Sequence, residues 1–368
     1  MTTVVLAGPA GESAHDGGPH PESPARVVAA MKGVHDLHLG SDLVTVDVGP
    51  ASREDLARVH SLRYLDELEA FSGRGGGALD PDTFVTSDSW DAACRAAGAG
   101  LAAVAELERR RDGVGFVAAR PPGHHAVRSR GMGFCLLNNV AVTAASLVAG
   151  GARVAIVDWD VHHGNGTQEI FWDEPAVLYI STHQSPLYPG TGRPDEIGGA
   201  RARGKTVNIP LPPGATGDVV SLAFSEVVAP AVDSFVPDWI LVSCGFDAHR
   251  ADPLAELALS SADFAALAAT VQQLAPCGGR TVLFLEGGYD LQAVRRSTAS
   301  TIGALVGDRT FPEDPTFGGP GADAVRAATM LRERALSEVD KECSGGGSLD
   351  APHTGSRGAP TTRLRSDW

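Results

Sequence analysis

Short apolar segments that run into chemically active side chains constrain the fold of this chain more than any other feature. The segment 154–157 is uninterrupted in apolar residues and ends directly in Asp158. Similar runs occur at residues 177–180, 239–244 and 281–285, and segments with helical spacing lie between several of them. Uninterrupted apolar runs are typical of strands buried on both faces. The pattern therefore predicts an α/β fold: a mostly parallel central sheet with helices on both faces.

The same signals outline the rest of the chain. Two further strands are expected at residues 3–7 and 114–118. The expected helices cover residues 24–35, 54–71, 89–110, 137–149, 166–172, 218–235 and 261–275. After about residue 337 the sequence contains GGGS, scattered proline and threonine, and no periodicity. We therefore predict one catalytic domain over residues 1–336, and a flexible and catalytically dispensable tail over residues 337–368.

Composition excludes several classes of protein. Of the 368 residues 43% are apolar, which is enough for one sizeable core. The 45 acidic and 30 basic side chains give a net charge of −15, which disfavours nucleic acid as a partner and attracts a cationic substrate. The sequence has neither a signal-peptide pattern nor an apolar run of the roughly 18 residues that a membrane span needs. We therefore expect no nucleic acid and no membrane as partners.

Cysteine and lysine usage indicate the cellular compartment and the kind of genome. The five cysteines are odd in number, widely spaced and without a CxxC motif, so we expect reduced thiols and a cytoplasmic protein. The 30 basic residues comprise 3 lysines and 27 arginines, and with abundant alanine, glycine and proline this indicates a bacterial gene of high GC content. The sequence does not fix the oligomeric state and leaves a homo-oligomer open.

Acids and histidines follow the ends of several predicted strands. The carboxyl ends of parallel strands lie at one edge of a sheet, where ligands bind. Asp160 and His162 follow the run 154–157, and Asp247 follows the run 239–244. Residues two apart in an extended segment face the same side, so these three side chains form the set of nitrogen and oxygen ligands that catalytic zinc uses. The alternative is that Asp160 caps a turn and His162 is a loop histidine with satisfied hydrogen bonds.

Two adjacent histidines can supply the proton transfers of general acid–base catalysis. His124 and His125 follow the strand at 114–118 in a Pro-Pro-Gly turn, where such residues are commonly surface loop residues. Here Asp158 and Asn165 can hold their ring nitrogens, which fixes the tautomer and the basicity of each imidazole.

Aromatic side chains complete the candidate site. Tyr289 lies in a Gly-Gly-Tyr turn after the run 281–285, and its hydroxyl can donate to a substrate oxygen as negative charge develops. Gly133, Phe134 and Tyr188 can supply the walls of a narrow tunnel. Ordinary core packing is the alternative for each aromatic side chain.

Several motifs taken together resemble one family. They are RPPGHH (120–125), GFCLLNN (133–139), DWDVHHGNGTQ (158–168), YPGTG (188–192), GFDAHRADPL (245–254) and LEGGYD (285–290). With HPESPAR (20–26), they resemble in the same order the histone deacetylase / acetylpolyamine amidohydrolase family, over about residues 1–330. The HHGNG form is similar to the class II branch and its bacterial relatives.

The resemblance implies the arginase/deacetylase fold and a zinc-dependent deacetylase that acts on linear amides. A catalytic zinc is implied at Asp160, His162 and Asp247. His125 matches the main general base and acid, and Asn165 matches the residue that orients it. His124, paired with Asp158, matches the electrostatic partner.

Further roles follow from the same resemblance. Tyr289 matches the transition-state tyrosine, and Arg26 matches an arginine of the acetate exit channel. The acyl-lysine tunnel is matched by Gly133, Phe134 and Tyr188. A structural potassium ion is implied at Asp158, Asp160, His162, Ser181 and Thr182.

The substrate stays open between acetyl-lysine in a protein and a small acetylated amine. Polyamine-selective class II relatives carry glutamate after an Asp-Pro pair, where this chain has Leu254, and the leucine favours lysine deacetylation. Bacterial acetylpolyamine amidohydrolases use a dimer to shape the entrance instead, so they remain an alternative. A ureohydrolase with two manganese ions needs further ligands where Gly164 stands. A silent acyl-lysine binding module would lack Tyr289 or one of the two histidines. The sequence does not distinguish zinc from iron.

Overall fold

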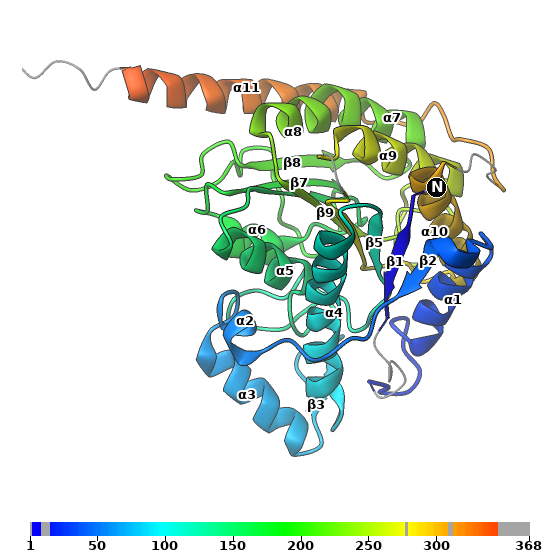
Figure 1. Cartoon of the computed structure of the whole chain (residues 1–368). Helices are drawn as coiled ribbons and strands as arrows, with labels where there is room; N and C mark the ends of the chain where they lie inside the picture. Colours follow the sequence, from blue (N-terminus) through cyan, green and yellow to red (C-terminus); the bar gives the residue numbers. More distant parts are fainter. Residues whose placement is uncertain (1, 9–14, 277–278, 308–311, 345–368) are drawn as a thin grey trace, which may run out of the picture.

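A parallel sheet forms the centre of the molecule (Figure 1). The computed structural model describes residues 2–8, 15–276, 279–307 and 312–344. Among these residues, eight strands lie in the order β2-β1-β5-β10-β9-β6-β7-β8, and every neighbouring pair is parallel. The strands are β1 (Val4–Ala7), β2 (Leu43–Thr45), β5 (Val114–Val117), β6 (Val154–Asp158), β7 (Val177–Gln184), β8 (Thr206–Leu211), β9 (Trp239–Cys244) and β10 (Thr281–Leu285).

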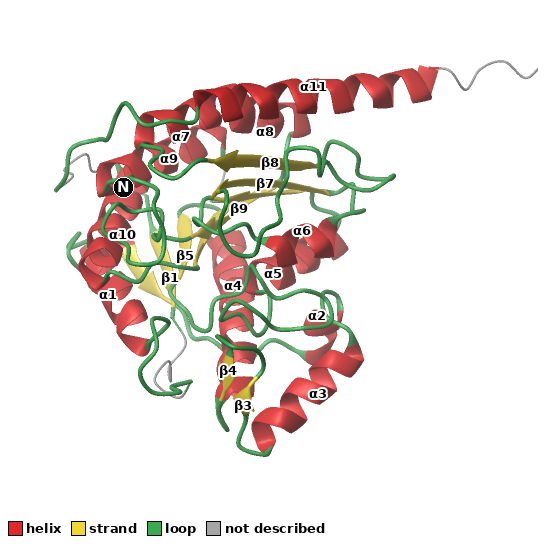
Figure 2. Ribbon diagram, turned by 180° about the vertical axis from the view of Figure 1, so that it is seen from behind, coloured by secondary structure: helices red, strands yellow, loops and turns green. Residues whose placement is uncertain are grey.

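Helices cover both faces of this sheet, as the uninterrupted apolar runs predicted (Figures 1 and 2). One face carries α2 (Arg53–Ala57), α3 (Leu62–Gly73), α4 (Ser89–Arg110), α5 (Asn139–Ala149) and α6 (Asn165–Phe171). The other carries α1 (Pro24–His35), α7 (Gly217–Ala223), α8 (Ala229–Phe235), α9 (Ser261–Leu274), α10 (Leu291–Val306) and α11 (Ala322–Ser344). A π-helical turn, Phe224–Val228, joins α7 to α8, and a small hairpin of β3 (Gly77–Ala78) and β4 (Phe84–Val85) lies apart from the sheet.

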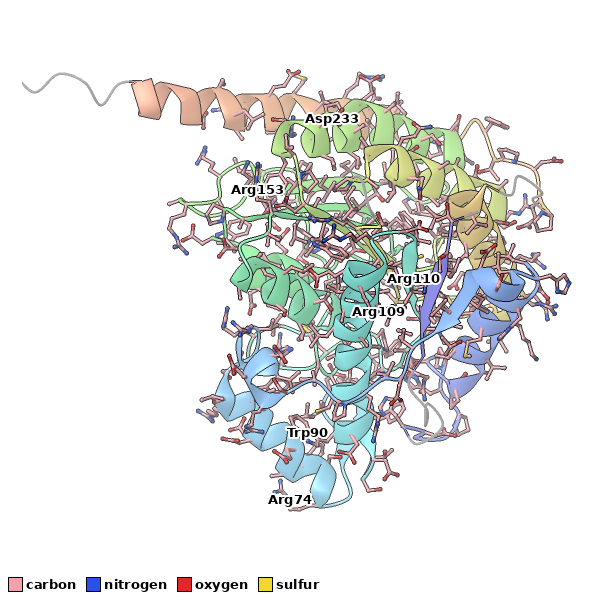
Figure 3. The ribbon with its side chains drawn as sticks, viewed as in Figure 1. Arg74, Trp90, Arg109, Arg110, Arg153 and Asp233 are labelled. Atoms are coloured by element: carbon pink, nitrogen blue, oxygen red, sulfur yellow. The ribbon has the colours of Figure 1, made fainter. Side chains whose placement is uncertain are left out.

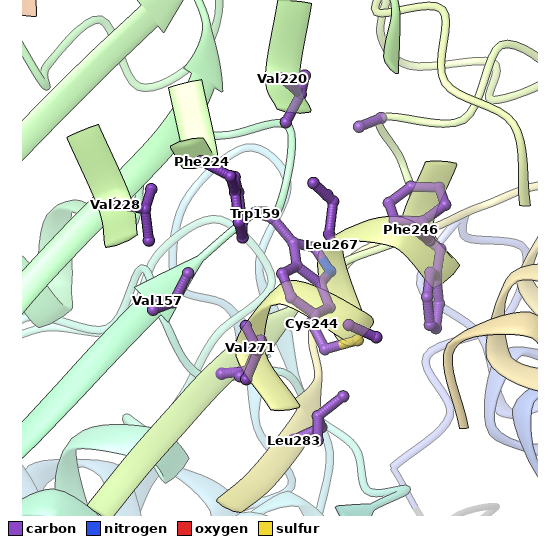
Figure 4. Close-up of a cluster of buried hydrophobic side chains, with 14 of the residues drawn as sticks. Val157, Trp159, Val220, Phe224, Val228, Cys244, Phe246, Leu267, Val271 and Leu283 are labelled. Atoms are coloured by element: carbon purple, nitrogen blue, oxygen red, sulfur yellow. The ribbon is translucent and has the colours of Figure 1, made fainter. Parts of the chain in front are cut away.

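Each face of the sheet packs into its own apolar core. Successive residues of β6 alternate between the two cores: Ala155 and Val157 face one, and Val154 and Ile156 face the other. Figure 4 shows the first core around Trp159, whose ring centroid lies 6.3 Å from that of Phe224. Burial of a large apolar side chain contributes about 1.5–3 kcal/mol. The strands are therefore anchored on both sides, and the loops at their carboxyl ends start from fixed points.

The sequence-based boundaries need two corrections. The expected helix over 54–71 is two helices, α2 and α3, because the Ser61 hydroxyl accepts a hydrogen bond from the Tyr64 backbone N–H (3.2 Å) and so begins a new helix. The predicted tail from residue 337 is also wrong at its start, because α11 continues to Ser344. Glu338 in that stretch pairs with Arg334 one turn earlier (3.0 Å). The rest of the predicted tail, 345–368, lies outside the described residues.

Outer faces of the helices carry charged side chains that pair with near neighbours (Figure 3). Arg109 and Arg110, at the end of α4, both reach the Glu106 carboxylate, at 2.6 and 3.4 Å. Solvent screens such exposed pairs, so they add little to the stability of the fold. None of the helices among the described residues has both the length and the apolar character to cross a bilayer.

A half-buried carboxylate ties the segment after α10 to the loop that follows β9. Glu313 accepts hydrogen bonds from His249 Nε2 (2.9 Å), the Ser261 backbone N–H (3.0 Å) and Arg250 (3.0 Å). Although partial burial opposes the shift, the bonds from His249 and Ser261 lower the pKa of Glu313 from 4.5 to about 2. A folded-state pKa below the unfolded value stabilises the fold above pH 4.5, and this contribution is lost as the pH falls towards 2.

Glu313→Gln is therefore expected to lower the free energy of unfolding by about 1–2 kcal/mol at pH 7, after allowance for solvent screening. Chemical denaturation at several pH values measures this difference, which should shrink between pH 4.5 and the lowest workable pH. Glu67→Gln, which breaks the exposed pair with Arg63, is the control and should leave the free energy of unfolding nearly unchanged at every pH. A Glu313→Gln deficit that does not change with pH would contradict the charge-based account.

Candidate metal centre and proton-transfer residues

Four loops that carry the sequence-predicted residues start from the carboxyl ends of adjacent strands. β6 pairs with β9, β9 with β10, and β10 with β5. In register, Asp158 at the end of β6 lies opposite Ser243 of β9 and Ser181 of β7. Because these strands end at one edge of the sheet, their loops meet above that edge, as expected for a parallel sheet.

Asp160, His162 and Asp247 converge on one point. One ligand atom from each residue lies within 4.8 Å of the others, and this is the one such group of His, Cys, Asp and Glu in the part of the chain that the structure describes. His162 Nδ1 lies 3.1 Å from Asp160 Oδ1 and 3.2 Å from Asp247 Oδ2. Both carboxylates are fully buried. Asp247 Oδ2 accepts no hydrogen bond of suitable geometry from the described residues.

The electrostatics of this group favour a bound cation. Burial, and then the neighbouring charge of Asp160, raise the pKa of Asp247. Although burial opposes it, contacts with Asp160 and then Asp247 raise the pKa of His162 to about 10. Two buried carboxylates around one imidazole thus hold a proton at the point between them. A divalent cation there would take the place of that proton and satisfy the orphaned Asp247 oxygen, so the residues fit a metal ion.

Glycine is required next to the metal group. The Gly287 N–H donates to Asp160 Oδ2 (2.7 Å), and a Cβ atom at Gly287 would lie 1.8 Å from Asp247 Oδ2. The LEGGYD motif therefore brings its backbone against both carboxylates, and any side chain at this position would displace them.

His124 is held by a carboxylate. Its Nδ1 lies 3.1 Å from Asp158 Oδ2, which also accepts a hydrogen bond from the Tyr179 hydroxyl (3.1 Å). Burial opposes protonation of the ring. However, the charges of Asp160 and Asp158 raise the pKa of His124 to about 10, so this imidazole is cationic at neutral pH.

His125 is held by a neutral amide. Its Nδ1–H donates to Asn165 Oδ1 (2.8 Å), which leaves Nε2 with a free lone pair. Burial, and then the positive charges of His124 and His162, lower the pKa of His125 well below 6.5. The two adjacent histidines therefore differ in charge, one a cation and one a neutral base.

Aromatic rings and Gly133 surround the two histidines. The Tyr289 ring lies edge-to-face with Phe134 at 5.8 Å, and the Tyr188 ring lies edge-to-face with His125 at 5.2 Å. Gly133 fits between His125 and Tyr188, because a Cβ atom there would come within 2.9 Å of both rings. The structure therefore brings the predicted tunnel residues Gly133, Phe134 and Tyr188 to the site. Leu254, which was also predicted to line the tunnel, is 38% exposed, and its backbone N–H donates to the Asp252 carboxylate (3.0 Å); its place in the tunnel stays a prediction.

Comparisons with known proteins match this arrangement. Residues 20–305 match the model of the histone deacetylase domain family, and this range includes every residue of the site. The chain belongs to the histone deacetylase family.

Relatives of this deacetylase-family chain come from several kingdoms. It is 40% identical to a histone deacetylase-like amidohydrolase of Pseudomonas aeruginosa, over 80% of this chain and 79% of the relative. It is 41% identical to histone deacetylase 10, chloroplastic, of Oryza sativa, over 82% and 74% of the two chains. It is similar to the crystal structure of the HDA15 HD domain, with a TM-score of 0.83, 33% identity, and coverage of 95% of this chain and 99% of that one. The chain is thus a hydrolase of a metal-dependent family, and the arginase/deacetylase fold is confirmed.

Sequence reasoning gave no role to three buried charged residues behind the histidine loop (residues 120–125), namely Glu22, Arg120 and Glu286; the prediction of Arg26 at the acetate exit channel stays a prediction. Glu22 accepts hydrogen bonds from Arg120 (2.6 and 2.8 Å) and from Arg26 (3.1 Å). The Glu286 carboxylate accepts the backbone N–H groups of Gly123 (2.7 Å) and His124 (3.2 Å). The position of Glu286 directly after a strand was a usable signal, because it shares that position with the other site residues.

Proposed function

We propose that the chain is a zinc-dependent deacetylase that hydrolyses the acetyl-amide of a lysine side chain in a protein or of a small acetylated amine. One observation supports this most directly: two buried carboxylates and an imidazole share one point beside a pair of histidines, one of which is held by a carboxylate and the other by a neutral amide. Asp160, His162 and Asp247 would hold the zinc. A zinc ion with three protein ligands supplies a Lewis acid that polarises the amide carbonyl and activates water.

The two histidines would then have separate roles in proton transfer and charge stabilisation. His125 Nε2 accepts the proton of the attacking water, because Nδ1 is already committed to Asn165. The same nitrogen returns the proton to the leaving amine. His124 keeps its charge throughout, since Asp158 holds its Nδ1–H, and it stabilises the negative charge that develops next to it.

Tyr289 would donate a hydrogen bond from its hydroxyl to the substrate oxygen. Burial raises the pKa of Tyr289 well above 10, so the hydroxyl keeps its proton and remains a donor. Tyr289→Phe is expected to lower kcat about 10²–10³-fold, the usual cost of one lost oxyanion donor, with metal content unchanged.

Steady-state kinetics together with metal analysis check the role of Tyr289. Tyr64→Phe is the matched control, because it removes a buried hydroxyl that bonds to the Leu136 carbonyl (2.7 Å) and not to the metal group or the two histidines. It should leave kcat within a few-fold of wild type. A Tyr289→Phe enzyme with unchanged kcat would show that the hydroxyl does not take part.

A structural potassium ion is proposed at the residues that the family resemblance implies. Supporting contacts are the Asp158–Ser181 register and the full burial of both side chains. The remaining ligands would be the backbone carbonyls of Asp160, His162 and Thr182.

The net charge of −15 favours a cationic substrate and supports neither nucleic acid nor membrane as a partner. Described cysteines Cys94, Cys135 and Cys244 are free thiols, which fits the proposed cytoplasmic location.

An acetylpolyamine amidohydrolase remains the second candidate, since the relative from Pseudomonas aeruginosa is named as an amidohydrolase.

A substrate screen tests the proposal. The purified chain, loaded with Zn²⁺ or with Fe²⁺, would be incubated with an acetyl-lysine peptide, acetylputrescine and acetylspermidine, and acetate release would be measured. We expect metal-dependent hydrolysis, with the preferred substrate identifying the class. Binding of the peptide without turnover would instead indicate a silent binding module. Urea release from a guanidino substrate would indicate a ureohydrolase, for which the described residues show no second metal group.

A further inference from the structure

Glu286 is a buried carboxylate that no step of the proposed chemistry uses. Its side chain is 1% exposed. Oε2 accepts the backbone N–H of Gly123 (2.7 Å) and of His124 (3.2 Å), and Oε1 accepts the Ser243 hydroxyl (3.2 Å). Within the part of the chain that the structure describes, no arginine, lysine or histidine forms an ion pair with it. It is therefore bound by neutral donors, two of which belong to the histidine loop.

Burial of this carboxylate is costly. Desolvation raises the pKa of Glu286 to about 7, although the charge of His124 and the bond from Gly123 oppose the shift. An apolar residue would fill the same space without that cost. What the carboxylate adds is an acceptor oxygen, Oε2, for two backbone N–H groups that would otherwise be buried without partners.

The position of Glu286 in the chain connects two catalytic segments. It lies three residues before Tyr289, and its carboxylate binds the segment that carries His124 and His125. A second connection between the same two segments begins at Arg26. Arg26 donates to the backbone carbonyls of Glu286 and Gly288 (2.6 Å to Gly288).

Glu22 completes that second connection. It joins Arg26 to Arg120, the first residue of the RPPGHH loop. Two connections thus link the tyrosine turn (residues 286–289) to the histidine loop (residues 120–125). One is the Glu286 carboxylate, and the other is the Arg26–Glu22–Arg120 chain.

We propose that Glu286 is a positioning residue that sets the His124–His125 pair against the Tyr289 turn. The inference rests on the proposed deacetylase chemistry. Its physical basis is that proton transfer and oxyanion stabilisation act on the same substrate amide, so His125 Nε2 and the Tyr289 hydroxyl must keep a fixed separation. A misplacement of about 1 Å can cost on the order of 10²-fold in rate.

Three variants separate positioning from a general structural role. Glu286→Ala removes all three acceptor contacts. Glu286→Gln keeps an oxygen for the Gly123 and His124 N–H groups, while its NH₂ group can donate to the Ser243 hydroxyl. Ser243→Ala removes only the contact with Oε1 and leaves the histidine loop bonded, so it is the matched control.

Kinetics give the first readout. We expect Glu286→Ala to lower kcat on the order of tenfold or more with KM within about twofold, and with full zinc content. Glu286→Gln should recover most of that loss, and Ser243→Ala should stay close to wild type. A kcat for Glu286→Ala equal to that of Ser243→Ala, or no recovery in Glu286→Gln, would overturn the proposal.

NMR of histidine labelled with ¹⁵N gives a second readout that does not depend on turnover. The imidazole signals of His124 and His125 should move in Glu286→Ala and stay near their wild-type positions in the other two variants. Unchanged signals in Glu286→Ala would overturn the positioning role even if kcat falls. A wild-type chain that hydrolyses none of the acetylated substrates contradicts the proposed function alone, because the imidazole signals still decide the role of Glu286.

Discussion

Asp247→Ala is expected to remove the bound metal and the hydrolytic activity together. Asp247 Oδ2 lies 3.2 Å from His162 Nδ1 and accepts no hydrogen bond from the described residues, so its remaining lone pairs are available to a cation. Two ligands do not hold catalytic zinc, which uses three from the protein. The loss in turnover should exceed the roughly 10²–10³-fold that one oxyanion donor contributes, because the Lewis acid itself is missing.

Without bound metal, the Asp247→Ala substitution should affect thermal stability differently than it does with zinc present. Burial and the charge of Asp160 raise the pKa of Asp247, which shows that the two carboxylates destabilise each other. Removal of one carboxylate relieves this repulsion. After chelation, this relief is opposed by the loss of the acceptor for the buried Val161 N–H (2.9 Å), so the thermal unfolding midpoint of Asp247→Ala should lie close to that of the wild type. With zinc present, the wild type should gain stability and the variant should not.

Metal analysis by mass spectrometry, turnover and thermal unfolding in zinc and in chelator measure these outcomes. Asp195→Ala is the control, since it removes an exposed carboxylate that pairs with Arg193 on the surface. Full zinc occupancy together with turnover in Asp247→Ala would disprove the ligand assignment.

The sheet was predictable from the sequence where strands are buried on both faces. The runs at β6, β9 and β10 are mostly apolar because alternate residues enter two different cores, so the sequence pattern and the packing have the same cause. The edge strands gave no such signal. β8 contains Asn208 and Pro210, which are tolerated because β8 is the last strand of the sheet and bonds on one side. β2, at the other edge, has only three residues.

Helix α10 was missed for a different reason. Its RRSTAST segment lacks apolar spacing, yet Ser297, Thr298, Ser300 and Thr301 are buried in the structure. Helical periodicity is a signal of one apolar face, and a helix whose buried face carries small hydroxyl side chains does not show it.

The residues that do the chemistry were easier to predict than the residues that hold them. Asp160, His162 and Asp247 follow strands of the sheet, and topology brings strand ends together before any side chain is placed. Glu22 and Arg120 lie about a hundred positions apart and share no element, so their bond is set by how two loops pack. No local pattern records such packing.

His125→Ala is expected to lower kcat about 10²–10⁴-fold while the zinc remains bound, because the side chain that accepts and returns the proton is lost. Asn165→Ala should cost less, on the order of tenfold. It leaves the imidazole in place but releases Nδ1–H from its acceptor, which is 2.8 Å away. The order of the two effects tests whether Asn165 acts through His125.

Chemical rescue separates a lost base from a damaged site. Removal of the His125 ring opens a space beside Tyr188, whose ring centroid is 5.2 Å from that of His125. Added imidazole should enter this space and restore part of the turnover of His125→Ala, and it should not raise the turnover of the wild type or of the exposed-site control His35→Ala. The raised pKa of His124 comes from Asp160 and then Asp158 rather than from His125, so its stabilising charge persists in the variant. Turnover of His125→Ala within a few-fold of wild type would mean that another group moves the proton, and that the difference in charge between the two histidines is not used as we propose.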